Sequence, residues 1–216
     1  MSTVSALKFL PEFMGQKRNT FAEGEREVRQ ALKNYLRRCV TIVNWQAEGQ
    51  PIIAFVNQVK WDRDVVLTFN YDMLLERAMK IAGVAAGDRV LHLHGSIGER
   101  TLAYPTYKKL AYKNTRSTLA KRWKDAFSHL RNLGRADRLI FIGYSMPPSD
   151  FEAKGLFNYT DWYNAYDSAG SYSYQILLVN KDPTVVGNYS FLRRPPGLRV
   201  ETFASWISCG EVSKAT

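Results

Sequence analysis

Cysteine is scarce in this sequence, since Cys39 and Cys209 are the only two among 216 residues. Two distant thiols cannot build a four-thiolate zinc site or a dense disulfide framework, and this usage is what we expect of a reducing cytoplasm. Long apolar runs are also lacking. No segment approaches the roughly 20 apolar residues of a bilayer-spanning helix, and the N-terminus has no long apolar core like that of a secretory signal. We therefore expect a cytoplasmic protein without a membrane segment.

What the chain does contain is material for a core. Apolar residues make up 45% of the sequence and aromatic residues 13%, which is too much for a largely disordered chain. Lys and Arg outnumber Asp and Glu by 30 to 20, so the formal net charge is +10. This surplus favours phosphate-bearing partners without identifying one. Without internal repeats or a Gly/Ser linker, we expect a single domain over residues 1–216, with a helical lead-in over 1–60 and an α/β core over 61–204.

Helix starts and stops can be read from capping residues and apolar spacing. Thr20 and Glu23 have the spacing of a capping box, in which each side chain satisfies a backbone N–H at a helix start. A helix should therefore follow Thr20. Residues 51–56 are apolar and predict a second helix, although so short a run could also be a strand. Further helices are expected after Asp72 up to Gly83, over 118–133 with a stop at Gly134, and over 150–167.

Short aliphatic and β-branched runs alternate with these helices from residue 65 onward. Such alternation is typical of parallel α/β sheets, whose strands are buried on both faces. Five strands are expected: Val65–Phe69, Val90–Leu93, Leu139–Ile142, Gln175–Val179 and Leu198–Phe203. The predicted fold class is therefore α/β, a parallel sheet flanked by helices and preceded by an N-terminal helical segment.

Polar residues follow four of these strands directly. They are Asn70-Tyr71-Asp72, His94-Gly95-Ser96, Gly143-Tyr144-Ser145 and Asn180. Each has a structural explanation of its own, because Asp72 can cap a helix, while Gly95, Gly143 and Asn180 suit turns. In open parallel sheets, however, ligands bind beyond the carboxyl ends of the strands, where helix N-termini also point. Four clusters at these ends predict a nucleotide-type pocket.

His94 is the candidate catalyst among these residues. The Gly-Ser that follows it allows a sharp turn, which would leave the imidazole facing the crevice. The alternative is that His94 is a hydrogen-bonded structural residue, which is the more common role of a lone histidine at a strand end. His92 lies two residues earlier on the same strand, but no third ligand has suitable spacing nearby. We therefore expect no metal site.

The strand-end residues resemble those of a known family. Thr68-Phe69-Asn70-Tyr71-Asp72 is similar to the Thr-x-Asn-x-Asp segment of sirtuins and of bacterial sirtuin-like NAD hydrolase domains, and Tyr before Asp is typical of the latter. Leu93-His94-Gly95-Ser96 resembles their Leu-His-Gly-Ser motif. Gly143-Tyr144-Ser145 resembles their Gly-x-Ser segment, and Leu178-Val179-Asn180 their strand ending in Asn. The four motifs occur in the family's order over about residues 62–182.

The resemblance implies a Rossmann-like domain that binds NAD and breaks its nicotinamide–ribose bond, as in bacterial antiphage systems. It implies catalytic roles for Asn70, which orients the nicotinamide-ribose end or the attacking water, and for His94, a general base. Asp72 would contact the nicotinamide amide or support its loop. The residues expected to contact NAD are Thr68, Asp72, Gly95, Ser96, Gly143, Ser145 and Asn180. Loss of nicotinamide develops positive charge on the ribose, which fixed dipoles and a positioned base can stabilise in the transition state.

Two departures from the family pattern leave alternatives open. Residues 1–64 contain only the isolated Gly15, Gly24 and Gly49, whereas family members begin with a strand and a Gly-Ala-Gly phosphate loop. This favours a truncated or degenerate relative, or a loop supplied by another chain. The four zinc-binding cysteines of deacylating sirtuins are also missing, which disfavours a protein deacylase.

The alternatives to an NAD hydrolase are therefore a catalytically inactive nucleotide-binding, regulatory or assembly module, and a nucleic-acid-binding protein. The nucleic-acid hypothesis rests on the basic segment 104–124, whose charges also suit a solvated surface. Homo-oligomers or a partner defence subunit are further expected partners.

Overall fold

The structure is a computed structural model that describes residues 27, 30, 31, 33–35, 38, 45, 49–85, 87–97, 118–134, 137–167, 174–210 and 212. The chain divides into two compact units, Met1–Val43 and Asn44–Thr216. In the first unit the described residues are helical, and Gln30 Nε2 donates to Asn34 Oδ1 one turn later at 3.0 Å. These residues agree with the predicted helical lead-in, whereas the capping box at Thr20 lies outside the described residues.

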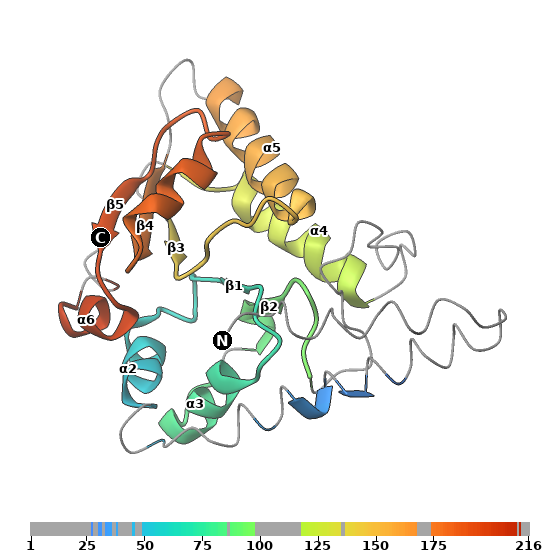
Figure 1. The fold of residues 1–216 in the computed structure, drawn as a ribbon, viewed down its shortest axis with the longest axis vertical. Helices are drawn as coiled ribbons and strands as arrows, with labels where there is room; N and C mark the ends of the chain where they lie inside the picture. Colours follow the sequence, from blue (N-terminus) through green and yellow to red (C-terminus); the bar gives the residue numbers. More distant parts are fainter. Residues whose placement is uncertain are drawn as a thin grey trace, which may run out of the picture. The chain divides into compact units, whose positions relative to one another are not determined.

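The second unit contains the α/β core (Figure 1). Its helices are α2 (Gln50–Gln58), α3 (Leu74–Ala82), α4 (Thr118–Arg131), α5 (Phe151–Asp167) and α6 (Phe203–Ser208). Its strands are β1 (Val66–Thr68), β2 (Val90–His92), β3 (Arg138–Ile142), β4 (Gln175–Asn180) and β5 (Gly197–Val200). Two short 3₁₀ segments, η3 (Gly87–Arg89) and η5 (Pro183–Tyr189), complete the described elements. None of these described helices is both long enough and apolar enough to cross a bilayer.

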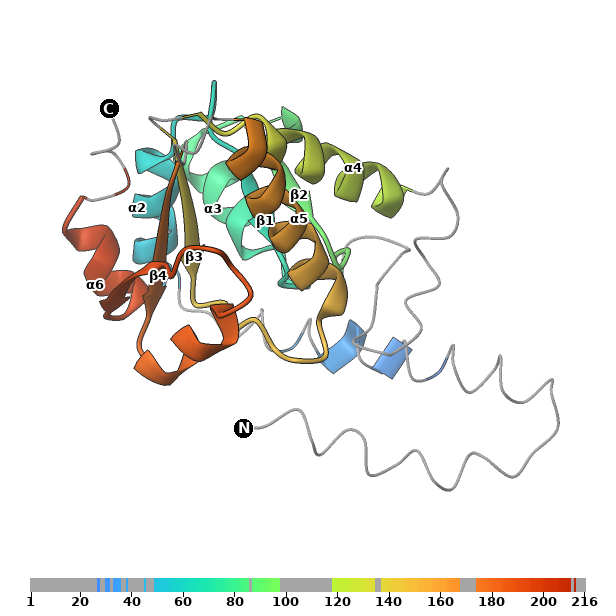
Figure 2. The same ribbon diagram turned by 90° about the horizontal axis from the view of Figure 1, so that it is seen from above.

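All described strand pairs are parallel. β1 pairs with β2, placing Thr68 opposite His92, and β3, β4 and β5 form a second sheet in that order. Helices α4 and α5 lie on one side of β3 and β4, and α2 and α6 lie on the other (Figure 2). The α/β, Rossmann-like fold class is therefore confirmed. The five strands pair as two small sheets, and side chains beyond the ends of β1 and β3 join them.

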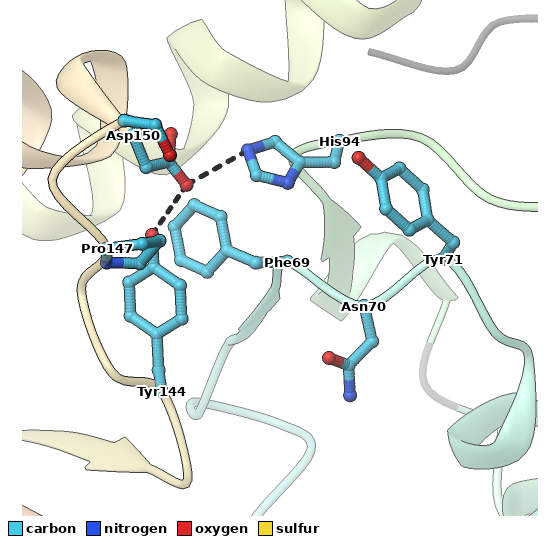
Figure 3. Close-up of a pocket in the computed structure, with 8 residues that line it drawn as sticks. Phe69, Asn70, Tyr71, His94, Tyr144, Pro147 and Asp150 are labelled. Atoms are coloured by element: carbon cyan, nitrogen blue, oxygen red, sulfur yellow. Dashed lines mark hydrogen bonds and ion pairs between the residues drawn. The ribbon is translucent and has the colours of Figure 1, made fainter. Parts of the chain in front are cut away.

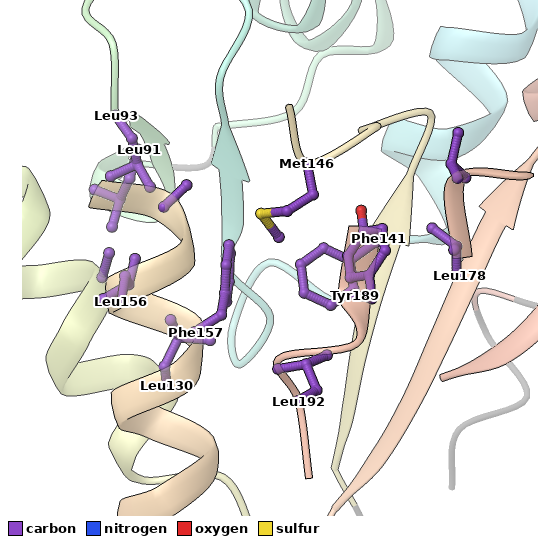
Figure 4. Close-up of a cluster of buried hydrophobic side chains, with 13 residues drawn as sticks. Leu91, Leu93, Leu130, Phe141, Met146, Leu156, Phe157, Leu178, Tyr189 and Leu192 are labelled. Carbon is purple, nitrogen blue, oxygen red and sulfur yellow. The ribbon is translucent and has the colours of Figure 1, made fainter. Parts of the chain in front are cut away.

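The main hydrophobic core lies between β3–β4 and the helices α4 and α5 (Figure 4). Phe141 on β3 packs edge-on against Phe157 of α5 and Tyr189 of η5, with ring centroids 4.8 and 4.9 Å away. Leu178 on the neighbouring strand β4 is fully buried. Because burial of each such side chain contributes about 1.5–3 kcal/mol, this cluster fixes how the helices lie on the sheet.

The helix predicted over residues 51–56 is confirmed, because α2 spans Gln50–Gln58 and packs against α3 and α6. One predicted boundary changes in the structure. The predicted strand Leu198–Phe203 ends at Val200. The reason is the Thr202 side chain, which accepts the backbone N–H of Ser205 and caps α6, so that Phe203 starts a helix.

Two glycines allow a test of backbone strain against helix propensity. Apart from the chain neighbours and the local helix backbone, no described atom lies within 4 Å of a Cβ placed on Gly143 or Gly155, but Gly143 has φ +63° and Gly155 lies inside α5. Gly143→Ala is expected to lower the free energy of unfolding by about 1–2 kcal/mol, because alanine disfavours the left-handed region. Gly155→Ala is expected to raise it by about 1 kcal/mol. Urea denaturation measures both, and changes of the same sign would contradict the explanation.

Candidate functional site

The carboxyl ends of β1, β2 and β3 meet at one pocket (Figure 3). The pocket has a volume of about 210 Å³. Its lining consists of Phe69, Asn70, Tyr71, His94, Tyr144, Pro147, Ser149 and Asp150. It therefore lies where the strand-to-helix segments of a parallel sheet converge, which is the usual position of a ligand site in this fold class.

The centre of the pocket is a buried histidine–carboxylate pair. His94 Nε2 lies 3.2 Å from Asp150 Oδ2, and the two side chains are only 9% and 5% exposed. The same oxygen of Asp150 accepts a hydrogen bond from the Tyr144 hydroxyl at 2.6 Å (Figure 3). A buried carboxylate that contacts one imidazole nitrogen fixes the orientation of the ring. An oriented histidine of this kind suits proton transfer.

The Tyr144 hydroxyl stays protonated and donates to Asp150. Burial of the phenol, and then the hydrogen bond and charge of Asp150, raise the pKa of Tyr144 far above its usual 10. Its backbone carbonyl accepts the Tyr189 hydroxyl at 2.6 Å. Met146, two residues later, is fully buried and has φ 48°, a conformation that is strained for a non-glycine residue. Packing therefore holds this segment in a strained conformation beside the pocket.

Aromatic rings form the wall of the pocket. Phe69 stacks on Tyr144 with ring centroids 4.4 Å apart and an interplanar angle of 8°, and it meets His94 edge-on at 5.1 Å. Tyr71 also stacks on the His94 ring, with ring centroids 5.9 Å apart. Trp123 of α4 packs edge-on against Phe69 and donates from Nε1 to the Leu93 carbonyl at 2.7 Å. These contacts keep the imidazole in one orientation and surround it with low-polarity surface.

Of the residues predicted for the site, Asn70 and His94 line this pocket. The Asn70 side chain points away from the imidazole of His94 (Figure 3), so the two would act on different parts of a ligand. Thr68 Oγ1 accepts the backbone N–H of Asn70 at 3.1 Å and Asp72 Oδ1 that of Leu74 at 3.1 Å. The Thr68 hydroxyl oxygen and the Asp72 carboxylate oxygen therefore shape the turn from β1 into α3.

The remaining predicted residues lie at the neighbouring strand ends. Gly95 and Gly143 have φ 76° and φ 63°, so both serve turns that glycine favours. Ser96 is fully buried, and its Oγ has no hydrogen-bond partner among the described residues. The carbonyl of Ser145, an exposed residue, accepts from Asn188 Nδ2 at 2.8 Å. Asn180 is the last residue of β4 rather than the residue after it, and its Oδ1 accepts the backbone N–H of Asp182 at 3.0 Å.

Sequence reasoning missed Tyr144 and Asp150 as partners of His94. Asp150 directly precedes α5, and its backbone carbonyl accepts the N–H of Lys154 at 3.1 Å, so in the sequence it reads as a helix-capping residue. A signal was available in its position, because Asp150 is an acidic residue at the start of the helix predicted after the strand 139–142. Linear spacing could not show that it would face His94.

Two further points from the sequence concern the histidine pair His92 and His94, for which no metal site is expected, and the basic segment 104–124. His92 and His94 do not converge, since His92 contacts Glu76 and His94 contacts Asp150. Within the described residues no group of three His, Cys, Asp or Glu side chains could hold a metal ion. Most of the basic segment 104–124 lies outside the described residues. In the part described, Lys121 forms an ion pair with Asp125 at 3.2 Å.

Comparisons of this chain with protein-family models, with curated proteins and with solved structures found no match. The pocket and the order of the four strand-end motifs are therefore the features that bear on function.

Proposed function

We propose that this chain hydrolyses the nicotinamide–ribose bond of NAD, with His94 and Asn70 as catalytic residues, and that it does so in bacterial antiphage defence. The observation that carries the proposal is the buried His94–Asp150 pair in an aromatic pocket at the ends of three parallel strands. The motif resemblance supplies the reaction and the biological setting. The pocket geometry supports a proton acceptor placed where a ligand of this fold class binds.

The size and lining of the pocket suit one ring of the dinucleotide. A volume of about 210 Å³ lies below the roughly 300–1,000 Å³ of pockets that enclose drug-sized ligands. A planar nicotinamide ring would pack against the aromatic wall of Phe69 and Tyr144. The ribose, phosphates and adenosine would then extend over the neighbouring strand ends, toward Gly143, Ser145 and Asn180.

In the proposed reaction, water adds to C1′ of the ribose while the bond from C1′ to the nicotinamide nitrogen breaks. The bonding electron pair leaves with nicotinamide, which becomes neutral, and His94 accepts the proton lost by the water. Asp150 stabilises the imidazolium that forms, and Asn70 orients the water or the ribose. The products are nicotinamide, ADP-ribose and a proton. A positioned base of this kind contributes about 10²–10⁴-fold to the rate.

One observation favours a second candidate, a nucleotide-binding module without turnover. The described core begins with α2 and β1, and residues 1–64 contain no Gly-Ala-Gly loop to hold the pyrophosphate. Such a module would keep the aromatic pocket and bind NAD or a related nucleotide as a regulatory or assembly subunit. Assembly with further copies or a defence partner stays a prediction, as does nucleic-acid binding through residues 104–124.

The test is the release of nicotinamide from NAD by the purified full chain, followed by chromatography. Wild type is expected to turn over, and Asn70→Ala to lose about 10²–10³-fold, the usual loss when one positioned hydrogen-bonding group is removed. Asn57→Ala is the matched control, because Asn57 is exposed on α2 in the described structure. It should retain wild-type turnover.

The two candidates give different results in this assay. NAD binding by calorimetry without nicotinamide release would exclude the hydrolase and support the binding module. Neither binding nor release would overturn both. Release that is unaffected by Asn70→Ala would place the chemistry elsewhere in the chain.

A further inference from the structure

A second histidine–carboxylate pair contacts the backbone of Asn70, a residue that lines the pocket. His92, at the end of β2, has a side chain only 5% exposed, and its Nε2 contacts Glu76 Oε1 on α3. Its other ring nitrogen, Nδ1, lies 3.2 Å from the backbone carbonyl oxygen of Asn70. One imidazole therefore connects α3 to the turn that carries a proposed catalytic residue.

Both partners of His92 are acceptors, which determines how many protons the ring needs. A neutral imidazole carries one N–H and can donate to only one oxygen, so the other oxygen would face a lone pair. Two simultaneous hydrogen bonds require the doubly protonated imidazolium. Burial, the largest single effect, opposes this charge, but the hydrogen bond and charge of Glu76 and the Asn70 carbonyl together raise the pKa of His92 above its usual 6.5.

Glu76 supplies an independent reason for a positive charge at this position. Its second oxygen, Oε2, is buried and has no hydrogen-bond partner among the described residues. A carboxylate in that situation is unfavourable unless a cation lies beside it. Glu76 also lies in the first turn of α3, where the helix dipole favours negative charge. Arg122 of α4 is the other charged group acting on His92, and it opposes protonation.

We propose that His92 is a proton-dependent positioning residue. As an imidazolium it donates hydrogen bonds to both Glu76 and the Asn70 carbonyl. After losing one proton it keeps the hydrogen bond to Glu76 and releases the carbonyl. The remaining proton stays on Nε2, because a hydrogen bond to a carboxylate is stronger than one to a neutral carbonyl. Where it concerns turnover, this inference rests on the proposed function. Its structural part concerns only the turn after β1.

The direct test is nuclear magnetic resonance of the full chain between about pH 5.5 and pH 9, the range in which histidine titrates. We expect the two ring nitrogens of His92 to be protonated at the acidic end. The carbonyl ¹³C resonance of Asn70 is expected to move with the same midpoint as His92. A carbonyl resonance that stays constant while His92 titrates, or a ring that carries one proton at the acidic end, would overturn the proposal.

Glu76→Gln keeps the shape of the carboxylate but removes its charge. It is expected to lower the titration midpoint of His92 by roughly 1–3 pH units, the usual effect of losing an opposite charge nearby. Glu27→Gln is the matched control, because Glu27 is an exposed helical residue of the first unit. It should leave the midpoint unchanged. An unchanged midpoint in a folded Glu76→Gln variant would contradict the proposal.

Thermal stability gives a second readout that needs no activity. Because the pKa of His92 is higher in the folded than in the unfolded chain, protonation stabilises the fold fully below about pH 6.5. This stabilisation is lost as the pH rises through the folded pKa. The wild-type Tm should therefore fall more over that window than the Tm of Glu76→Gln, and equal pH dependence would count against the pair.

Turnover separates this inference from the proposed function. If NAD is hydrolysed, kcat should fall at high pH with the midpoint of the Asn70 carbonyl shift, and Glu76→Gln should move that step to lower pH. If NAD is not hydrolysed but the carbonyl shift follows His92, the proton-dependent contact stands and the hydrolase proposal fails. A pH profile of kcat that is identical in wild type and Glu76→Gln would remove His92 from catalysis.

Discussion

Replacing His94 by alanine is expected to lower kcat for nicotinamide release by about 10²–10⁴-fold, the contribution of a positioned general base. The expectation follows from the geometry around the ring. Asp150 lies 3.2 Å from Nε2, and Phe69 meets the ring edge-on at 5.1 Å, so the imidazole has one orientation toward the pocket. A water that replaced the ring would be neither as basic nor as well placed. Steady-state kinetics on NAD give kcat and KM separately.

Because His94 is buried, the alanine variant also loses packing, so a volume-conserving variant is needed beside it. His94→Gln fills most of the same space and should lose kcat to a similar extent while keeping a Tm close to wild type. His129→Ala is the matched control, because His129 is exposed on α4 in the described structure, and it should retain full turnover. Activity of His94→Gln within a factor of about two of wild type would show that no proton acceptor is needed at this position.

The largest expected effect on stability is that of Phe141→Ala. Removing a fully packed Phe side chain costs about 3–5 kcal/mol, through lost burial and the cavity that remains. Phe141 is 5% exposed and makes two edge-on aromatic contacts, to Phe157 and Tyr189, that link β3 to α5 and η5. The loss is therefore expected at the upper end of that range. Urea denaturation followed by circular dichroism measures the free energy of unfolding.

Phe151→Ala is the matched control for this variant. It makes the same substitution at a ring that is 61% exposed, at the first residue of α5. Surface substitutions usually change stability by no more than about 0.5 kcal/mol, so the two variants should differ several-fold. Equal losses in the free energy of unfolding would mean that the buried Phe141 ring contributes no more to stability than the exposed Phe151 ring.

The elements of the core could be predicted because local chemistry determines them. Buried parallel strands are continuous apolar runs, and β1, β2, β3 and β4 all form within one or two residues of the predicted ranges. Gly83 ends α3 in the left-handed conformation, as its lack of a Cβ allows. The end of β5 could not be predicted in this way. Residues 198–203 are rich in apolar and β-branched types, and only the hydrogen bond from Ser205 to Thr202 starts a helix there.

The candidate site was predictable in part. The order of strands and helices already places Asn70 and His94 at carboxyl ends of parallel strands, where both line the pocket. The same order of elements did not reveal that Asp150 contacts His94, 56 residues earlier in the chain. Nor did it reveal that Phe69 stacks on Tyr144. Such contacts depend on how strand ends and helices pack, and no spacing along the chain encodes them.

By itself, then, the sequence determined the α/β class, the positions of the strands and which polar side chains follow them. Only the tertiary structure decided which of those side chains line the pocket. The physical reason is that a chain leaving a strand has backbone N–H groups that need partners. The nearby oxygens of Thr68, Asp72 and Asn180 accept such groups locally, while the His94 ring reaches the Asp150 carboxylate in the segment between β3 and α5.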